Sequence, residues 1–120
     1  MASDLFVERI AAVRRRFVAK LDARLNEIES TVPRLANADS LEALARVHRH
    51  AHDLCGVGPT MGFVATGQAA RKVEQTLLAA LKSNRALTTD EMTRVTEDVA
   101  KLRSVAHAET QSAGGEPPPS

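Results

Sequence analysis

The sequence predicts an all-α protein that folds as an antiparallel four-helix bundle with up-down-up-down connections. Four segments repeat apolar residues at three- and four-residue steps, as amphipathic helices do, and no segment alternates apolar and polar residues as a strand would. Hydrophobic residues make up 43% of the 120-residue chain but aromatic residues only 2%. Such an aliphatic core suits packed helices better than a β-sandwich. Short connections between the segments favour antiparallel neighbours.

The first predicted helix carries its apolar residues along one face, with charged residues between them on a solvated face. Pro33 has no amide hydrogen for a helical hydrogen bond, so it ends this helix or starts a short irregular continuation. The apolar face consists of Phe6, Ile10, Val13, Phe17, Leu21, Leu25 and Ile28.

The second predicted helix opens with Asp39 and Glu42, whose three-residue spacing is that of a capping box. Gly56, Gly58 and Pro59 signal its end. Its inward side is formed by Leu41, Leu44, Ala45, Val47, His48, Ala51, Leu54 and Cys55.

The third and fourth predicted helices are separated by the polar turn Ser83–Arg85. The third runs from about residue 60 to residue 82, and Gly62 near its start would allow a close approach between helices. The fourth begins with a second capping box, formed by Thr88 and Glu91. The apolar seams are Phe63, Thr66, Ala70, Val73, Leu77 and Leu81 in the third helix and Met92, Val95, Val99, Leu102 and Ala106 in the fourth.

Residues 1–109 are therefore predicted to form one helical domain, followed by a tail at residues 110–120. The tail is rich in glycine, proline and serine and lacks apolar periodicity. It cannot bury enough apolar surface to offset the entropy of ordering it, so we expect it to be disordered.

Charge and composition argue against several classes of protein. The chain has 16 basic and 15 acidic residues, and this balance gives no electrostatic case for binding nucleic acid. No apolar run approaches the roughly 18–20 residues that span a bilayer, and the N-terminal residues do not form a secretory signal. The single cysteine, Cys55, rules out an internal disulfide. We expect a soluble, cytoplasmic monomer.

Three of the four histidines, His48, His50 and His52, fall within five residues of the second predicted helix. At about 100° per residue, His48 lies at the edge of the apolar side, His50 points to solvent, and His52 lies on the shoulder between them. A shoulder position packs one side of a ring and leaves the other in water. Gly56, at i+4 from His52, stacks next to it on the helix. A glycine there costs about 1 kcal/mol relative to alanine, but it leaves room for a reactive group to approach the ring.

A carboxylate in the third predicted helix is expected to orient His52. Glu74 lies about 40° from the centre of the apolar seam, where an unpaired charge is costly. If the two helices are antiparallel neighbours, Glu74 returns to a height near His52 or beyond it. An imidazole N–H would satisfy the carboxylate, and the carboxylate would fix the tautomer and leave the other ring nitrogen as a free lone pair. That is the arrangement of an oriented nucleophile.

The segment AHDLCGVGPTMGFVATGQAARKVEQTL, Ala51 to Leu77, resembles the signature of histidine-containing phosphotransfer (HPt) domains of two-component phosphorelays. The resemblance extends over roughly residues 4–108. The residues that match in type and spacing are His52, Leu54, Gly56, Gly62 and Glu74.

This resemblance implies a phosphocarrier without kinase activity of its own. His52 would accept a phosphoryl group on Nε2 from a receiver-domain aspartate or a (hybrid) sensor histidine kinase, and pass it to a response-regulator aspartate. Glu74 would orient the imidazole, and Gly56 would give steric access. The chain would need no cofactor of its own, because the partner receiver domain supplies Mg²⁺.

One position departs from the family pattern. HPt domains usually carry a lysine three residues after the histidine, where this chain has Cys55. Arg49, about one turn before His52, is the nearest basic residue on the exposed side, and we expect it to contact the phosphate.

Two other functions stay open at this level. His48 and His52, at i and i+4, could together hold one metal ion with a neighbouring glutamate, although the other helices contain no Glu-x-x-His pair. Alternatively, a non-catalytic helical adaptor would bind a partner helix in an apolar groove.

Overall fold

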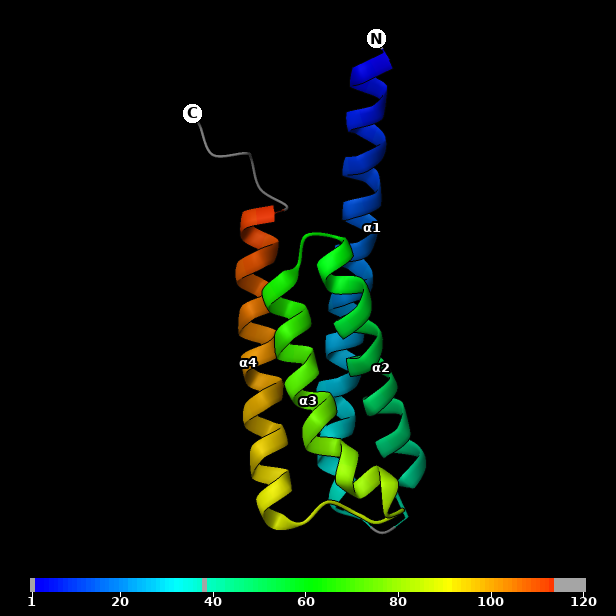
Figure 1. The fold of residues 1–120 in the computed structure, drawn as a ribbon, viewed down its shortest axis with the longest axis vertical. Helices are drawn as coiled ribbons and strands as arrows, with labels where there is room; N and C mark the ends of the chain where they lie inside the picture. Colours follow the sequence, from blue (N-terminus) through cyan, green and yellow to red (C-terminus); the bar gives the residue numbers. More distant parts are fainter. Residues whose placement is uncertain (1, 38, 114–120) are drawn as a thin grey trace.

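The computed structural model describes residues 2–37 and 39–113 as a bundle of four α-helices with short connections (Figure 1). Successive helices run in opposite directions, so the predicted all-α antiparallel bundle is confirmed, and the described ranges contain no strand. The elements are α1 (Ala2–Thr31), the 3-10 helix η1 (Val32–Ala36), α2 (Leu41–Thr60), α3 (Val64–Lys82) and α4 (Thr89–Ala113).

The centre of the bundle is filled by aliphatic side chains from all four helices, as the composition predicts. Phe63, between α2 and α3, is the largest fully buried side chain, and its ring centroid lies 5.0 Å from that of Phe17 on α1. Burying a side chain such as Phe63 contributes about 1.5–3 kcal/mol, and its contact with Phe17 joins α1 to the connection between α2 and α3. Other large side chains that are fully buried are Ile28, Leu35, Leu44, Leu54, Leu77, Leu102, Val47, Val73, Val95 and Thr66.

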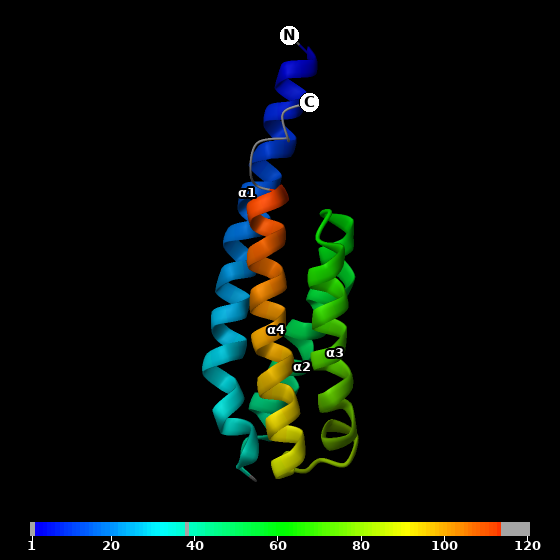
Figure 2. The same ribbon diagram turned by 90° about the vertical axis from the view of Figure 1, so that its left-hand side faces the viewer.

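α1 is longer than the helices beside it, and its N-terminal part extends beyond them (Figure 2). Within the predicted apolar face, Leu21, Leu25 and Ile28 are buried, whereas Phe6 is 61% and Ile10 45% exposed. The periodicity identifies the face, but it does not show how far the neighbouring helices reach along it.

The start of α2 differs from the sequence prediction. The helix begins at Leu41 with Ser40 as its N-cap residue and without a side-chain cap hydrogen bond, so the predicted capping box of Asp39 and Glu42 is wrong. The Ser40 hydroxyl instead donates to the carbonyl oxygen of Asn37 at 2.5 Å, within the turn that precedes the helix. This turn makes Ser40 the last residue before the helix and leaves Asp39 exposed.

The end of α2 also differs, because the helix continues through Gly56, Gly58 and Pro59 to Thr60. Pro59 lies in the last turn of the helix, and Phe63 N–H donates to the Gly58 carbonyl at 2.8 Å to close the connection to α3. As a result α3 begins at Val64, later than the position near residue 60 predicted from the sequence.

Glycines let α2 and α3 approach closely at this end of the bundle. A Cβ added to Gly67 would lie 2.7 Å from Cδ of Pro59, and one added to Gly58 would lie 3.0 Å from the carbonyl oxygen of Phe63. Gly62 has a different role from the close approach expected of it. Its φ of 88° turns the chain between the helices, in a region that glycine adopts at little cost.

The predicted capping box at the start of α4 is confirmed. Thr88 N–H donates to Oε1 of Glu91 at 2.9 Å, and Glu91 N–H donates to the Thr88 hydroxyl oxygen at 3.1 Å. Arg85 donates to both carboxylate oxygens of Glu91 at 2.7 and 3.2 Å. The hydrogen bonds from Arg85 and then Thr88 lower the pKa of Glu91 to about 2.

α4 continues to Ala113, whereas the sequence analysis placed the start of the tail at residue 110. Glu109, in this last part of α4, reaches the first turn of α3. Its carboxylate accepts from the backbone N–H of Ala65 at 3.2 Å and from the N–H and hydroxyl of Thr66 at 2.6 and 2.7 Å. The remainder of the predicted tail, residues 114–120, lies outside the described residues.

Candidate functional site

His52 lies on the exposed side of α2, where a hydrogen bond joins it to Glu74 of α3. The contact runs between Nδ1 of His52 and Oε2 of Glu74. The His52 side chain is 69% exposed and that of Glu74 18%. The antiparallel packing of α2 on α3 therefore brings together the two residues that the sequence analysis paired.

The hydrogen bond determines which nitrogen of His52 carries the proton. An ionised carboxylate can only accept, so Nδ1 must be the donor. In the neutral ring Nε2 then holds an unshared electron pair. A largely exposed imidazole with a fixed tautomer is suited to attack an electrophile brought by another molecule.

Gly56, one turn after His52, is exposed within α2, and a Cβ added there would meet nothing within 4 Å. Packing inside the chain therefore does not require a glycine at this position, in contrast to Gly58 and Gly67. Glycine in a helix costs about 1 kcal/mol relative to alanine. Contacts inside the chain therefore do not account for a glycine at this position.

The two neighbouring histidines differ in their surroundings. His48 is 20% exposed, and its Nε2 lies 3.8 Å from Oε2 of Glu74. The rings of His48 and His52 are nearly parallel, with centroids 6.3 Å apart and an interplanar angle of 8°. His50, expected to point to solvent, is half-buried. Glu74 therefore lies near two imidazoles and is hydrogen-bonded to one of them, His52, as the sequence predicts.

Arg49 is exposed on α2, as expected, and Cys55 is a half-buried free thiol. Arg49 precedes His52 by three residues, close to one helical turn, so both side chains extend from neighbouring positions of the same surface. No positively charged residue stands at position 55 to meet a phosphate.

Metal binding by this cluster receives no support from the geometry. Across residues 2–37 and 39–113, no group of three or more histidine, cysteine, aspartate or glutamate side chains is arranged to hold a metal ion. His48 and His52 approach the same oxygen of Glu74 from the same helix.

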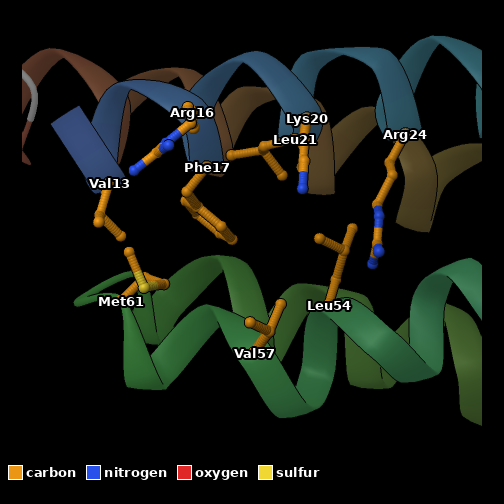
Figure 3. A pocket seen from close by; sticks show the side chains of 9 residues that line it. All are labelled: Val13, Arg16, Phe17, Lys20, Leu21, Arg24, Leu54, Val57 and Met61. Atoms are coloured by element: carbon orange, nitrogen blue, oxygen red, sulfur yellow. The ribbon is translucent and has the colours of Figure 1, made fainter.

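A groove of about 460 Å³ runs between α1 and α2 (Figure 3). Its floor is apolar, and the charged ends of Arg16, Lys20 and Arg24 extend from α1 towards α2. Arg24 also approaches Asp53 of α2, with a guanidinium nitrogen 3.7 Å from a carboxylate oxygen. The apolar lining consists of Val13, Phe17, Leu21, Leu54, Val57 and Met61.

This groove was not predicted from the sequence, although the sequence contains a signal for it. Arg16, Lys20 and Arg24 recur at four-residue steps and therefore share one helical stripe next to the apolar face. The sequence does not show which helix lies opposite that stripe.

The surface of this helical bundle therefore displays one hydrogen-bonded, largely exposed imidazole one turn from an exposed glycine. The family model of the Hpt domain matches residues 12–105, and the chain belongs to this family. No curated protein and no solved structure gives a match. None of the described helices combines the length and the apolarity needed to cross a membrane.

Proposed function

We propose that His52 is the phosphoacceptor of a two-component phosphorelay. Hpt domains are phosphocarrier modules of two-component signalling, not kinases, and they interact with receiver domains and histidine kinases. The single observation that carries the assignment to His52 is its Nδ1 hydrogen bond to Glu74, because this bond leaves Nε2 free on an exposed ring.

The chemical step is a transfer between two acceptors. The electron pair on Nε2 of His52 attacks phosphorus in the aspartyl phosphate of a receiver domain. The N–P bond forms, the P–O bond to the aspartate breaks, and the aspartate leaves as a carboxylate. The imidazole keeps its Nδ1 proton and becomes positively charged, and Glu74 offsets that charge through the existing hydrogen bond. The reverse step passes the group to a second receiver or back to the first.

Magnesium in this scheme belongs to the receiver domain, where it neutralises the phosphoryl oxygens. In this chain, we propose that Arg49 contacts the phosphate. The family usually has a lysine three residues after the histidine, but here that position is Cys55. Arg49 is exposed on the same surface as His52, which leaves its guanidinium available to a phosphoryl group.

The receiver domain would dock over His52, Gly56 and the groove between α1 and α2. The apolar lining offers surface that a bound receiver would bury, and Arg16, Lys20 and Arg24 make the groove positively charged. The aspartyl phosphate of a receiver is negatively charged, so opposite charges would steer the encounter. We propose that the carrier acts in the cytoplasm. We also propose that it is a monomer, because the core residues of one chain bury one another.

The experiment is phosphotransfer from a receiver domain that has been phosphorylated in the presence of Mg²⁺. We expect acid-labile, base-stable label on the parent protein and on the His50→Gln control, and none on His52→Gln. Label that persists on His52→Gln would refute His52 as the acceptor. Absence of label on the parent with every receiver tested would leave the chain as a helical adaptor instead.

A further inference from the structure

The side chain of His48 has a buried nitrogen that the proposed chemistry does not use. Its Nε2 has less than 1 Å² of accessible surface and no hydrogen-bond partner. Oε2 of Glu74 lies 3.8 Å from it. Because buried polar atoms in proteins are almost always hydrogen-bonded, an unpaired one calls for an explanation.

The arrangement around Glu74 supplies one. His48 and His52 lie one helical turn apart, with rings stacked at 8° and centroids 6.3 Å apart. Both rings present a nitrogen to the same oxygen, Nδ1 from His52 and Nε2 from His48. A carboxylate oxygen has two lone pairs and can accept from both rings.

The tautomer of His48 follows from electrostatics. An unprotonated Nε2 would point its lone pair at a carboxylate oxygen, which is repulsive, whereas an Nε2–H would be attracted to it. The gap of 3.8 Å exceeds a hydrogen bond of about 3 Å by less than 1 Å. A small rotation of the Glu74 side chain would close this gap.

We propose that His48 is a positioning residue for the phosphotransfer, and that it acts through Glu74. It donates Nε2–H to the carboxylate that orients His52, so that two neighbouring histidines hold opposite tautomers. Glu74 comes from α3 on a flexible side chain, and holding such a chain in one rotamer costs conformational entropy. A second donor lowers that cost and keeps the carboxylate aimed at Nδ1 while the ring gains charge.

The rate part of this inference rests on the proposed function, but the tautomers can be measured without any phosphate. Long-range ¹H–¹⁵N NMR of the unphosphorylated protein distinguishes protonated from unprotonated ring nitrogens. We expect Nδ1–H at His52 and Nε2–H at His48. Finding His48 as the Nδ1–H tautomer would overturn the proposal, whether or not His52 is ever phosphorylated.

Two variants separate the hydrogen bond from simple packing. His48→Phe keeps the flat ring beside His52 and removes the donor, whereas His48→Gln places an amide N–H near the position of Nε2. We expect His48→Phe to reduce the Nδ1–H population of His52 and slow transfer roughly fivefold, the effect of one lost hydrogen bond. His48→Gln should return both quantities to within about twofold of the parent.

His50→Phe, a histidine replaced on the same helix away from Glu74, is the matched control and should leave the His52 tautomer unchanged. If His48→Phe leaves both the tautomer and the rate unchanged, His48 only packs, and the proposal is wrong. Equal losses in His48→Phe and His48→Gln would likewise contradict it, because the restored donor would then have no effect. Should the Phe variant fail to fold, the parent tautomers and His48→Gln still decide the question.

Discussion

Glu74 accepts a hydrogen bond from Nδ1 of His52 across the interface between α2 and α3, although 22 residues separate the two in the sequence. The carboxylate is mostly buried, and the ring that it holds is mostly exposed. With the proton held on Nδ1, Nε2 of His52 keeps its unshared electron pair, and the hydrogen bond fixes the orientation of the ring. The proposed chemistry depends on both.

Replacing Glu74 tests the orienting role. Glu74→Ala should lower the rate of transfer from a phosphorylated receiver by roughly tenfold or more, the usual effect of removing a residue that orients a reactive imidazole. The transfer rate of Glu74→Gln should lie between those of Glu74→Ala and the parent protein, because an amide oxygen still accepts from Nδ1–H but carries no negative charge. A rate for Glu74→Ala equal to that of the parent, with the melting temperature unchanged, would contradict the role.

Two substitutions at Gly56 should affect the stability of the fold and the rate of phosphotransfer differently. Gly56→Ala meets open space, so it should raise the free energy of unfolding by up to about 1 kcal/mol through helix propensity. Gly56→Leu should fold equally well but slow transfer by at least about tenfold, because the side chain displaces the approaching phosphoryl group. Urea unfolding and transfer kinetics on the same samples measure the two effects.

Gly67→Ala is the matched control for a glycine that the fold requires. Its Cβ would lie 2.7 Å from Pro59, so we expect the free energy of unfolding to fall by about 1–3 kcal/mol. If Gly56→Ala destabilised the protein as much as Gly67→Ala, clearance for a partner would not explain Gly56.

The basic residues that line the groove, Arg16, Lys20 and Arg24, should increase the rate of encounter with the receiver. The double variant Arg16→Glu/Lys20→Glu should lower kcat/KM for transfer by roughly tenfold at low ionic strength, and the difference should shrink in high salt. Lys101→Glu, an equally exposed change on α4, is the control and should have little effect. A salt-independent loss, or equal losses in both variants, would argue against docking at the groove.

The capping box of α4 makes a pH-dependent contribution to stability. The pKa of Glu91 is about 2 in the folded protein, compared with 4.5 in its unperturbed state. The unfolded chain therefore takes up the proton first on acidification, and the contribution of Glu91 is lost as the pH falls from 4.5 towards 2. Glu91→Gln should lower the free energy of unfolding at neutral pH by about 1–2 kcal/mol. Unfolding curves at both ends of this range should show the parent and variant converging in acid.

The features that the sequence predicts well are those determined by local periodicity. The four helices, the capping box of Thr88 and Glu91, and the interruption at Pro33 each depend on residues within one or two turns. The pairing of His52 with Glu74 was also predictable, because a carboxylate next to an apolar seam needs a partner and the adjacent antiparallel helix offers an imidazole.

The features that the sequence does not predict depend on contacts between distant segments. Glu109 of α4 caps the first turn of α3, more than forty residues away, and no local pattern indicates that contact. Gly58 and Gly67 allow a close approach that depends on how α2 meets α3. The 3.8 Å approach of His48 to Glu74 and the groove beside Arg16 likewise depend on the positions of neighbouring helices.

The most direct test of the central claim is to locate the phosphate itself. After transfer from a receiver domain, ³¹P and ¹H–¹⁵N NMR of the labelled carrier identify both the residue and the ring nitrogen that is bonded to phosphorus. We predict a single phosphoramidate on Nε2 of His52, with Nδ1 still protonated beside Glu74. Phosphate on Nδ1 of His52, or on His48, would contradict the account.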